Sequence, residues 1–181
     1  MRSATRLIAL TLLALPLVWG GMARGEVFAN PGFYTVSVDG WTRVASPEGF
    51  RYRCTACKGQ VGVTIEYGPD APWKTNDQFM ASLSTEKARK ELADEWFGGQ
   101  PTDKRAKAEV KRVGLGEIGG LRVLMVVTEV DIGSASAFGR FMVAVHKGRL
   151  LWCAVHYPVG AVDPDNEKAI DAFFAGLVFE K

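Results

Sequence analysis

Three consecutive segments in the second half of the chain are apolar at nearly every position. They span 121–130, 138–146 and 149–157, and a run of small residues and then Lys147-Gly148 separate them. In the first segment, both alternating sets of positions are apolar: Leu121, Val123, Met125 and Val127 in one set, and Leu124, Val126 and Val130 in the other. Successive side chains of a strand point to opposite faces, so such a strand needs cover on both faces. The pattern predicts an antiparallel meander buried between two layers.

Shorter alternating patterns predict further strands outside this meander. Apolar residues alternate in 33–38, 50–54 and 61–67, and 108–113 and 177–179 are additional strand candidates. Asp39-Gly40 predicts a turn that ends the first of these strands. The glycine-rich segment 114–120 predicts a turn that leads into the meander.

Helix-capping residues predict two helices in the middle of the chain. Thr75 and Gln78 fit a capping box, in which each side chain satisfies a free backbone donor of the first turn. The apolar residues of 79–83 and of 92–97 fall nearly opposite each other at about 100° per residue. One straight helix cannot bury both sets, so we expect a break near 82–85. Ser84 or Thr85 would cap the second helix, and Gly98 would end it.

A third helix is predicted close to the end of the chain. Asp163 supplies a cap, Pro164 suits the first helical position, and acidic residues follow at the positive end of the helix. Ile170, Phe173 and Phe174 form its apolar stripe. These elements together predict an α+β protein with a single, mostly antiparallel β-sheet of six or seven strands and helices packed on both faces.

The first 29 residues have the pattern of a secretory signal peptide. Arg2 and Arg6 precede the apolar run 7–19, and small residues follow it. The run is too short to span a bilayer, which takes roughly 20 apolar residues. Cleavage after Ala23 or after Ala29 satisfies the small-residue rule, and we take Ala29 as the boundary. The prediction is an exported protein, periplasmic or secreted, with a single domain over 30–181 and no stable membrane span after cleavage.

Removal of this leader leaves no net charge. Cleavage after Ala29 takes away three of the 22 basic residues (Arg2, Arg6, Arg24) and one of the 20 acidic residues (Glu26), which leaves 19 of each. Nucleic-acid binding and adhesion to anionic membranes both draw on excess positive charge. We therefore expect neither partner for the mature protein.

The pair Cys54 and Cys57 is the most chemically suggestive motif. Thioredoxin-type chemistry lowers a thiol pKa at a helix N-terminus, but a strand pattern follows Cys57. A closed zinc site needs four ligands, and no second Cys pair exists. A disulfide across a tight turn is the preferred interpretation for an exported protein. Cys153 reads as a buried small residue, and a Cys153 bridge to either partner remains an alternative.

Cys153, His146 and His156 are the remaining candidates for a ligand or redox site. If Lys147-Gly148 is a two-residue turn, His146 opposes Arg149, and Met142 opposes Cys153. His146 and Cys153 then share a face but lie roughly 13 Å apart at the strand rise. His156 points to the other face. We therefore expect no metal and no cofactor.

Two glycine-containing segments can be compared with enzyme signatures. The six residues 114–119 read G-x-G-x-x-G, but a dinucleotide site requires a helix directly afterwards, and 121–130 reads as a strand. The segment 133–137 reads Gly-Ser-Ala-Ser-Ala and lacks the closing glycine of G-x-S-x-G, and it lies between two strands instead of between a strand and a helix. No catalytic set is predicted, so we expect a protein that is not an enzyme.

Several segments of the sequence resemble those of the PsbP-like and Mog-like family of α/β/α sandwiches. They are a strand leading into Asp-Gly-Trp41, a helix after a Pro-rich turn, the Gly-Gly-Leu121 strand, the meander, and the ending Ile-Asp-Ala-Phe-Phe-Ala-Gly-Leu-Val-Phe at 170–179. The resemblance implies a sandwich fold and a habit of binding partners. The family shares no catalytic residue set, so the resemblance implies no site.

The sequence therefore predicts an exported, non-enzymatic accessory or binding protein. Its expected partner is another envelope protein or a small apolar ligand. The alternative is an envelope thiol-redox or metal-handling protein that uses Cys54 and Cys57.

Overall fold

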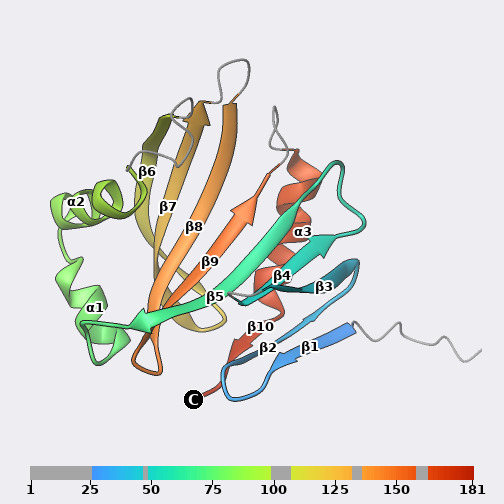
Figure 1. Cartoon of the computed structure of the whole chain (residues 1–181), viewed down its shortest axis with the longest axis horizontal. Helices are drawn as coiled ribbons and strands as arrows, with labels where there is room; N and C mark the ends of the chain where they lie inside the picture. Colours follow the sequence, from blue (N-terminus) through green and yellow to red (C-terminus); the bar gives the residue numbers. More distant parts are fainter. Residues whose placement is uncertain (1–25, 47–48, 99–106, 132–135, 158–162) are drawn as a thin grey trace, which may run out of the picture.

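Two antiparallel sheets and three helices make up the computed structural model, which describes residues 26–46, 49–98, 107–131, 136–157 and 163–181 (Figure 1). The large sheet has seven strands in the order β3 (Trp41–Ser46), β4 (Gly49–Cys54), β5 (Gly62–Asp70), β9 (Arg149–His156), β8 (Ser136–His146), β7 (Leu121–Asp131) and β6 (Lys107–Ile118). The small sheet has the order β1 (Glu26–Asn30), β2 (Tyr34–Val38) and β10 (Leu177–Phe179). The helices are α1 (Asn76–Ser82), α2 (Glu86–Phe97) and α3 (Pro164–Ala175).

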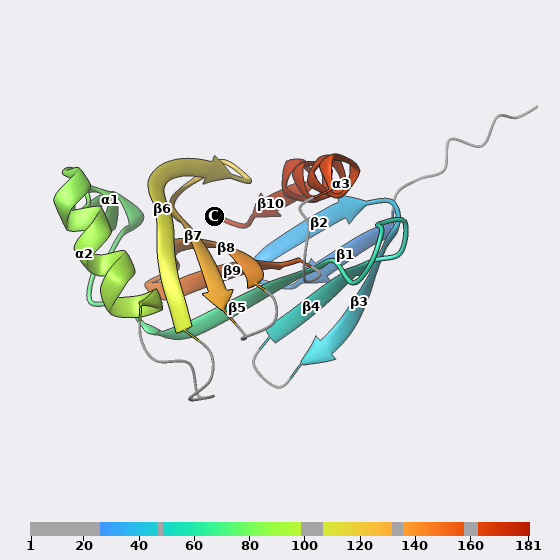
Figure 2. The same ribbon diagram turned by 90° about the horizontal axis from the view of Figure 1, so that it is seen from above.

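The large sheet is the middle layer between two hydrophobic clusters. Val123 of β7 belongs to a cluster formed with α3 and the small sheet, and we call this side of the large sheet the inner face. Leu124 and Val126 belong to a second cluster formed with α1 and α2, on the outer face. Figure 2 shows α1 and α2 on one side of the strands and α3 on the other. The prediction that the meander is buried on both faces, with helices on both sides, is confirmed.

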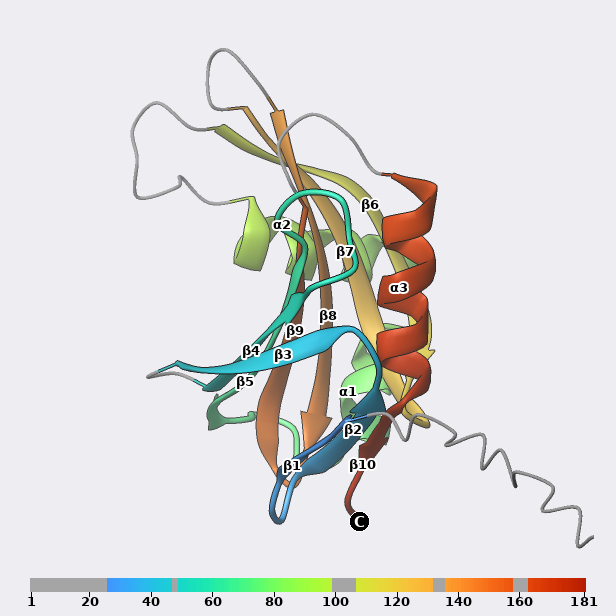
Figure 3. The ribbon, with the colours of Figure 1, turned by 90° about the vertical axis from the view of Figure 1, so that its right-hand side faces the viewer.

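The prediction of a single sheet is wrong. The strand at Tyr34, β2, pairs with β1 on one side and with the strand at Leu177, β10, on the other, in a separate small sheet that lies on the same side as α3 (Figure 3). Gly40 has a φ of +73°, and this turn carries the chain from β2 into β3 of the other sheet. Gly176 lets the end of α3 approach β2 closely, because a Cβ there would lie 2.1 Å from the Ser37 carbonyl oxygen. The predicted turn at Asp39-Gly40 therefore joins two different sheets.

The hairpin registers agree with the sequence except at the start of the meander. His146 pairs with Arg149, and Met142 pairs with Cys153, as predicted. The predicted turn at 114–120 is mostly wrong, because β6 continues through Gly114 and Gly116 to Ile118. Only Gly119 and Gly120 form the turn, and both have positive φ. No helix follows this turn, so the dinucleotide motif lacks the helix that it requires.

The helix boundaries follow the predicted caps. The Thr75 side chain accepts a hydrogen bond from the backbone N–H of Gln78, and the Thr85 side chain accepts one from Ala88. The predicted break between α1 and α2 is confirmed, as is the Asp163 cap, and Gly176 is the C-cap of α3. No helix in the described part of the chain is long and apolar enough to cross a bilayer.

The first described strand overlaps the predicted leader. Residues 1–25 lie outside the described residues, as do 132–135 in the small-residue turn. Residues 26–29, however, are part of β1. Phe28 is buried against Tyr52 with ring centroids 5.5 Å apart, and the Ala29 carbonyl accepts a 2.7 Å hydrogen bond from Arg43. A cut after Ala29 would remove both contacts, whereas a cut after Ala23 keeps β1 whole.

Starting the chain at Arg24 instead of Asn30 should therefore stabilise the protein. Loss of a buried Phe side chain typically costs about 3–5 kcal/mol, so we expect the longer form to unfold with a free energy higher by at least about 3 kcal/mol. Urea unfolding of the two purified forms measures this difference. Replacing Val27, which is 64% exposed, by Ala in the longer form is the control and should change little. Equal stability of the two forms would show that β1 contributes nothing.

Candidate functional site

The predicted pair Cys54 and Cys57 forms a disulfide at the end of β4, with 5.5 Å between the two Cα atoms. Cys54 is buried in the inner cluster, and Cys57 packs at its margin. The backbone N–H and the side-chain hydroxyl of Thr55 both donate to the Gly40 carbonyl, at 2.7 and 3.0 Å. The disulfide therefore closes a turn that is already held against the β2–β3 connection.

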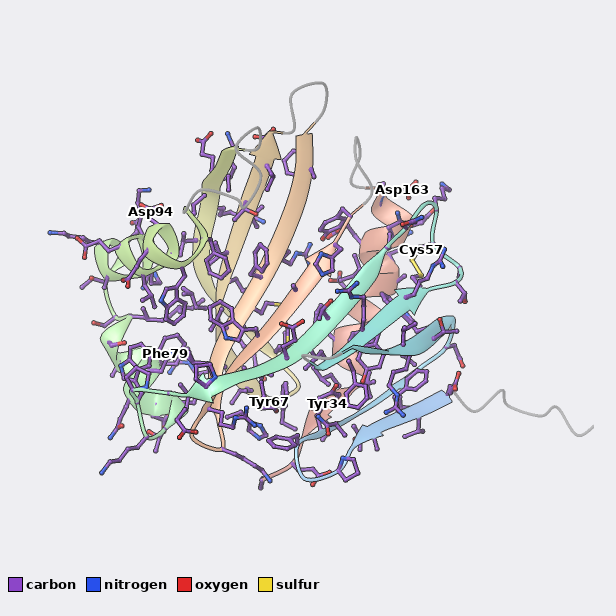
Figure 4. All side chains as sticks on the ribbon, viewed as in Figure 1. Tyr34, Cys57, Tyr67, Phe79, Asp94 and Asp163 are labelled. Atoms are coloured by element: carbon purple, nitrogen blue, oxygen red, sulfur yellow. A yellow bond between two sulfur atoms is a disulfide. The ribbon has the colours of Figure 1, made fainter. Side chains whose placement is uncertain are left out.

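A set of polar contacts holds this turn on the first turn of α3. The buried side chain of Asn166 accepts from the backbone N–H of Lys58 and donates to its carbonyl, both at 3.0 Å. The Lys58 ammonium lies 3.0 Å from Asp163 and 3.7 Å from Asp165. The hydrogen bond to Lys58 lowers the pKa of Asp163. Figure 4 shows the disulfide at Cys57 close to Asp163, so these groups act together as a fastening between β4 and α3.

Cys153 is a free thiol in the inner cluster, on β9. It is 1% exposed, and burial raises the pKa of the thiol far above its ordinary value. A thiol held in the protonated state is a poor nucleophile and a poor metal ligand. The alternative bridge from Cys153 to one of the other cysteines does not form in this structure.

His146 lies on the inner face, and both of its ring nitrogens have hydrogen-bond partners. Its Nε2 lies 2.8 Å from the Glu180 carbonyl oxygen, which can only accept, so Nε2 carries the proton. The Nδ1 atom then accepts the Tyr67 hydroxyl proton at 2.6 Å. Burial lowers the pKa of His146, in agreement with a neutral ring. His146 thus connects β8, β5 and the end of the chain.

His156 lies on the outer face, as predicted, since its neighbour Val155 belongs to the inner cluster. Its Nε2 is 3.0 Å from the Thr64 hydroxyl oxygen. Burial of the ring and the nearby Arg51 lower its pKa. The two histidines and Cys153 do not come together, and no group of three or more His, Cys, Asp or Glu side chains among the described residues could hold a metal ion.

The structure reveals a groove that the sequence did not indicate. Beyond the Gly49–Glu66 pair, β5 has no β4 partner among the described residues, and an open groove of about 740 Å³ follows this exposed edge. The β1–β2 turn borders it on the other side. Its lining is Asn30, Phe33, Gly49, Ile65, Glu66, Tyr67, Gly68, Arg149 and Trp152.

Three aromatic side chains line the groove, and the Arg149 guanidinium there is already hydrogen-bonded. The Phe33 and Tyr67 rings are 4.4 Å apart, and Tyr67 lies between β5 and the small sheet in Figure 4. The Arg149 guanidinium donates to the carbonyls of Tyr67 and Gly68, with a closest distance of 2.8 Å. Burial raises the pKa of Tyr67, so its hydroxyl stays protonated. This arrangement suits an apolar or aromatic guest better than general acid–base chemistry.

Sequence reasoning missed these residues because they come from three separate elements. The register shift between Tyr67 and Asp70 brings Arg149 back over the β5 backbone. Gly68-Pro69 within the β5 pattern is the one local signal of that irregularity. A strand that stops pairing where a proline approaches is a common place for an open edge.

Comparison with known proteins finds similarity in structure but none in sequence. No protein-family model matches the chain, and no curated protein matches it. The structure of PsbP (CyanoP) from Synechocystis sp. PCC 6803 aligns with 17% identity and a TM-score of 0.49, over 93% of this chain and 99% of that one. LpqN, involved in cell envelope biogenesis of Mycobacterium tuberculosis, aligns with 12% identity and a TM-score of 0.45, over 87% and 91%.

The first of these structures carries the name of the family that the sequence resembles. The identities are far below those at which residues can be transferred. No residue of the groove or of the fastening is assigned a role from these two proteins.

A thiol count should report one free thiol in the unfolded, unreduced protein and three after reduction. The three are Cys54, Cys57 and Cys153. Reaction with a chromogenic disulfide reagent in guanidinium measures both states in protein taken from an oxidising compartment. The Cys153→Ser variant is the control, and it should give no free thiol before reduction and two free thiols after reduction. Three free thiols before reduction would contradict the disulfide.

The neutral state of His146 should make stability depend on pH. Its folded pKa is lowered relative to about 6.5 for an unfolded histidine, so the unfolded state binds more protons. The contribution of the neutral His146 ring to the free energy of unfolding is complete above about pH 6.5, and it is lost as the pH falls below that value. Urea unfolding at pH 7.5 and pH 5.5 should show a smaller decrease for His146→Gln than for the wild type. An equal decrease would assign the pH dependence to other groups.

Proposed function

We propose that this protein is an exported, non-enzymatic binding or accessory protein, and that its groove takes a small apolar or aromatic ligand. The observation that carries the proposal is the lining of the groove by Phe33, Tyr67 and Trp152 from three different elements. Ligand sites are typically concave, mostly apolar and roughly 300–1,000 Å³ in volume. The volume of about 740 Å³ falls within that range.

The support for export combines the leader pattern with the chemistry of the described chain. Disulfides persist in oxidising compartments and are rare in the cytosol. The turn at Cys54 and Cys57 is packed on α3, and it carries a disulfide suited to a structural role. A periplasmic or secreted location follows from this proposal.

The alternative function is thiol exchange at Cys54 and Cys57. Only Cys57 is partly accessible, so a reducing partner would attack there. Thioredoxin-like reactivity depends on a thiol whose pKa is lowered at a helix N-terminus. Cys54 instead ends a strand within the hydrophobic core, which favours a structural disulfide.

Binding of a neutral aromatic probe tests the proposed function. We expect N-phenyl-1-naphthylamine to bind with increased fluorescence, and to accept energy from Trp152 at the groove. Phe33→Ala removes one ring of the lining, and a single aromatic contact is worth about 0.5–1.5 kcal/mol, so the Kd should rise about two- to tenfold. A fluorescence titration at neutral pH measures the Kd.

Val27→Ala is the matched control, because Val27 lies on the neighbouring strand β1, is exposed, and does not line the groove. It should bind the probe like the wild type. Failure of the probe to bind, or equal binding by Phe33→Ala and the wild type, would overturn the assignment of the groove.

A further inference from the structure

Half of the outer face of the large sheet has no cover in the described part of the chain. Helices α1 and α2 pack mainly on β6, β7 and β8. The outer hydrophobic cluster includes no residue of β3, β4 or β5. Val44 of β3 consequently remains 53% exposed on this face. The side chains on this uncovered half form an arrangement that differs from the lining of the groove.

Two arginines and a histidine gather on this uncovered half. Residues paired across antiparallel strands share a face, and the register places Arg53, Gly62, His156 and Gly139 in one row. Arg51 lies in the next row, beside Thr64. Gly62 and Gly139 flank His156 and have no side chains, so the surface of the sheet is recessed around the imidazole ring. A hollow of about 340 Å³ results, lined by Val44, Arg51, Tyr52, Arg53, Gln60, Val61, Gly62 and His156.

The charges in this hollow are not balanced. No lining residue is acidic, and no ion pair between described residues involves Arg51 or Arg53. On the neighbouring strands, the described charged residues that share the outer face with His156 are these two arginines of β4 and Glu66 of β5, while β8 presents Gly139 and Phe141 there. Glu66 lies at the groove and has an interaction of its own. Arg51 is close enough to His156 to lower its pKa.

We propose that this hollow binds a small organic anion, a carboxylate or phosphate group on a short apolar body. Guanidinium groups recognise both oxyanions through charge-assisted hydrogen bonds. Val44 and the aliphatic stems of the arginines supply the apolar contact. The volume fits a small molecule. The hollow and the groove share no lining residue, so this site is independent of the proposed function.

An NMR titration of the two histidine rings tests the site, with sodium hexanoate as the probe and hexanol as its uncharged counterpart. A carboxylate beside Arg51 offsets the positive field and favours the imidazolium, so the pKa of His156 should rise by roughly 0.5 pH unit. His146 is the internal control, because it lies on the inner face, bonded to Tyr67 and Glu180. Hexanol should shift neither ring. Added salt should weaken the response.

Variants separate the site from unspecific effects. Arg51→Gln should raise the pKa of His156 without hexanoate and weaken hexanoate binding about two- to fivefold, as expected for an exposed charge pair. Arg53→Gln should also weaken binding. Arg112→Gln removes another exposed arginine, on β6, and should bind like the wild type.

Two results would overturn the proposal. One is an unchanged His156 pKa with hexanoate, or the same change with hexanol or in Arg51→Gln. The other is Arg51-dependent binding to phosphatidylglycerol vesicles without any hexanoate response, which would assign the face to a lipid surface. Failure of the naphthylamine probe in the groove leaves the hexanoate result unaffected, so the two proposals can fail separately.

Discussion

The two-sided burial of β7, β8 and β9 is the constraint on which the rest of the structure depends. Val123 and Leu124 are adjacent in sequence and fully buried, yet they belong to opposite clusters. A strand of this kind is stable only as the middle layer of a sandwich, because exposure of either face would leave several large apolar side chains in water. Helices α1 and α2 supply one cover. Helix α3 and the small sheet supply the other.

The small sheet covers the part of the inner face that α3 is too short to cover. Helix α3 is 12 residues long, and a single helix of about 18 Å cannot cover a seven-stranded sheet. Tyr34, Val36 and Leu177 of the small sheet cover the part next to α3, and the Tyr34 and Tyr52 hydroxyls bond to each other at 3.0 Å between the sheets. The hydrogen bond between Lys58 and Asn166 holds the first turn of α3 against the turn that follows β4.

Both proposed binding regions arise where this cover is incomplete. The groove follows the part of β5 that has lost its β4 partner, and the small sheet supplies its far wall through Phe33. The hollow lies on the outer face beyond the reach of α1 and α2. The first exposes aromatic rings, and the second exposes two guanidinium groups that form no ion pair with any other described residue, so the two regions suit guests of different chemistry. The inner cluster behind them provides a rigid support for both.

The sequence by itself determined the elements that depend on local physics. The caps at Thr75, Thr85 and Asp163, the break between α1 and α2, and the register of the β8–β9 hairpin all depend on residues within a few positions of one another. The pairing of Cys54 with Cys57 was legible for the same reason. Periodicity also determined that the meander lies between two layers, since apolar residues on both faces leave no other stable arrangement.

Only the tertiary structure decided which sheet each outer strand joins and where the cover ends. An alternating strand pattern states that one face is buried, but it does not state against what. Tyr34 and Tyr52 carry the same local pattern and belong to different sheets. The groove and the hollow each combine residues more than 90 positions apart, such as Phe33 with Trp152 and Arg51 with His156. Their proximity results from long-range pairing and packing, which no local propensity encodes.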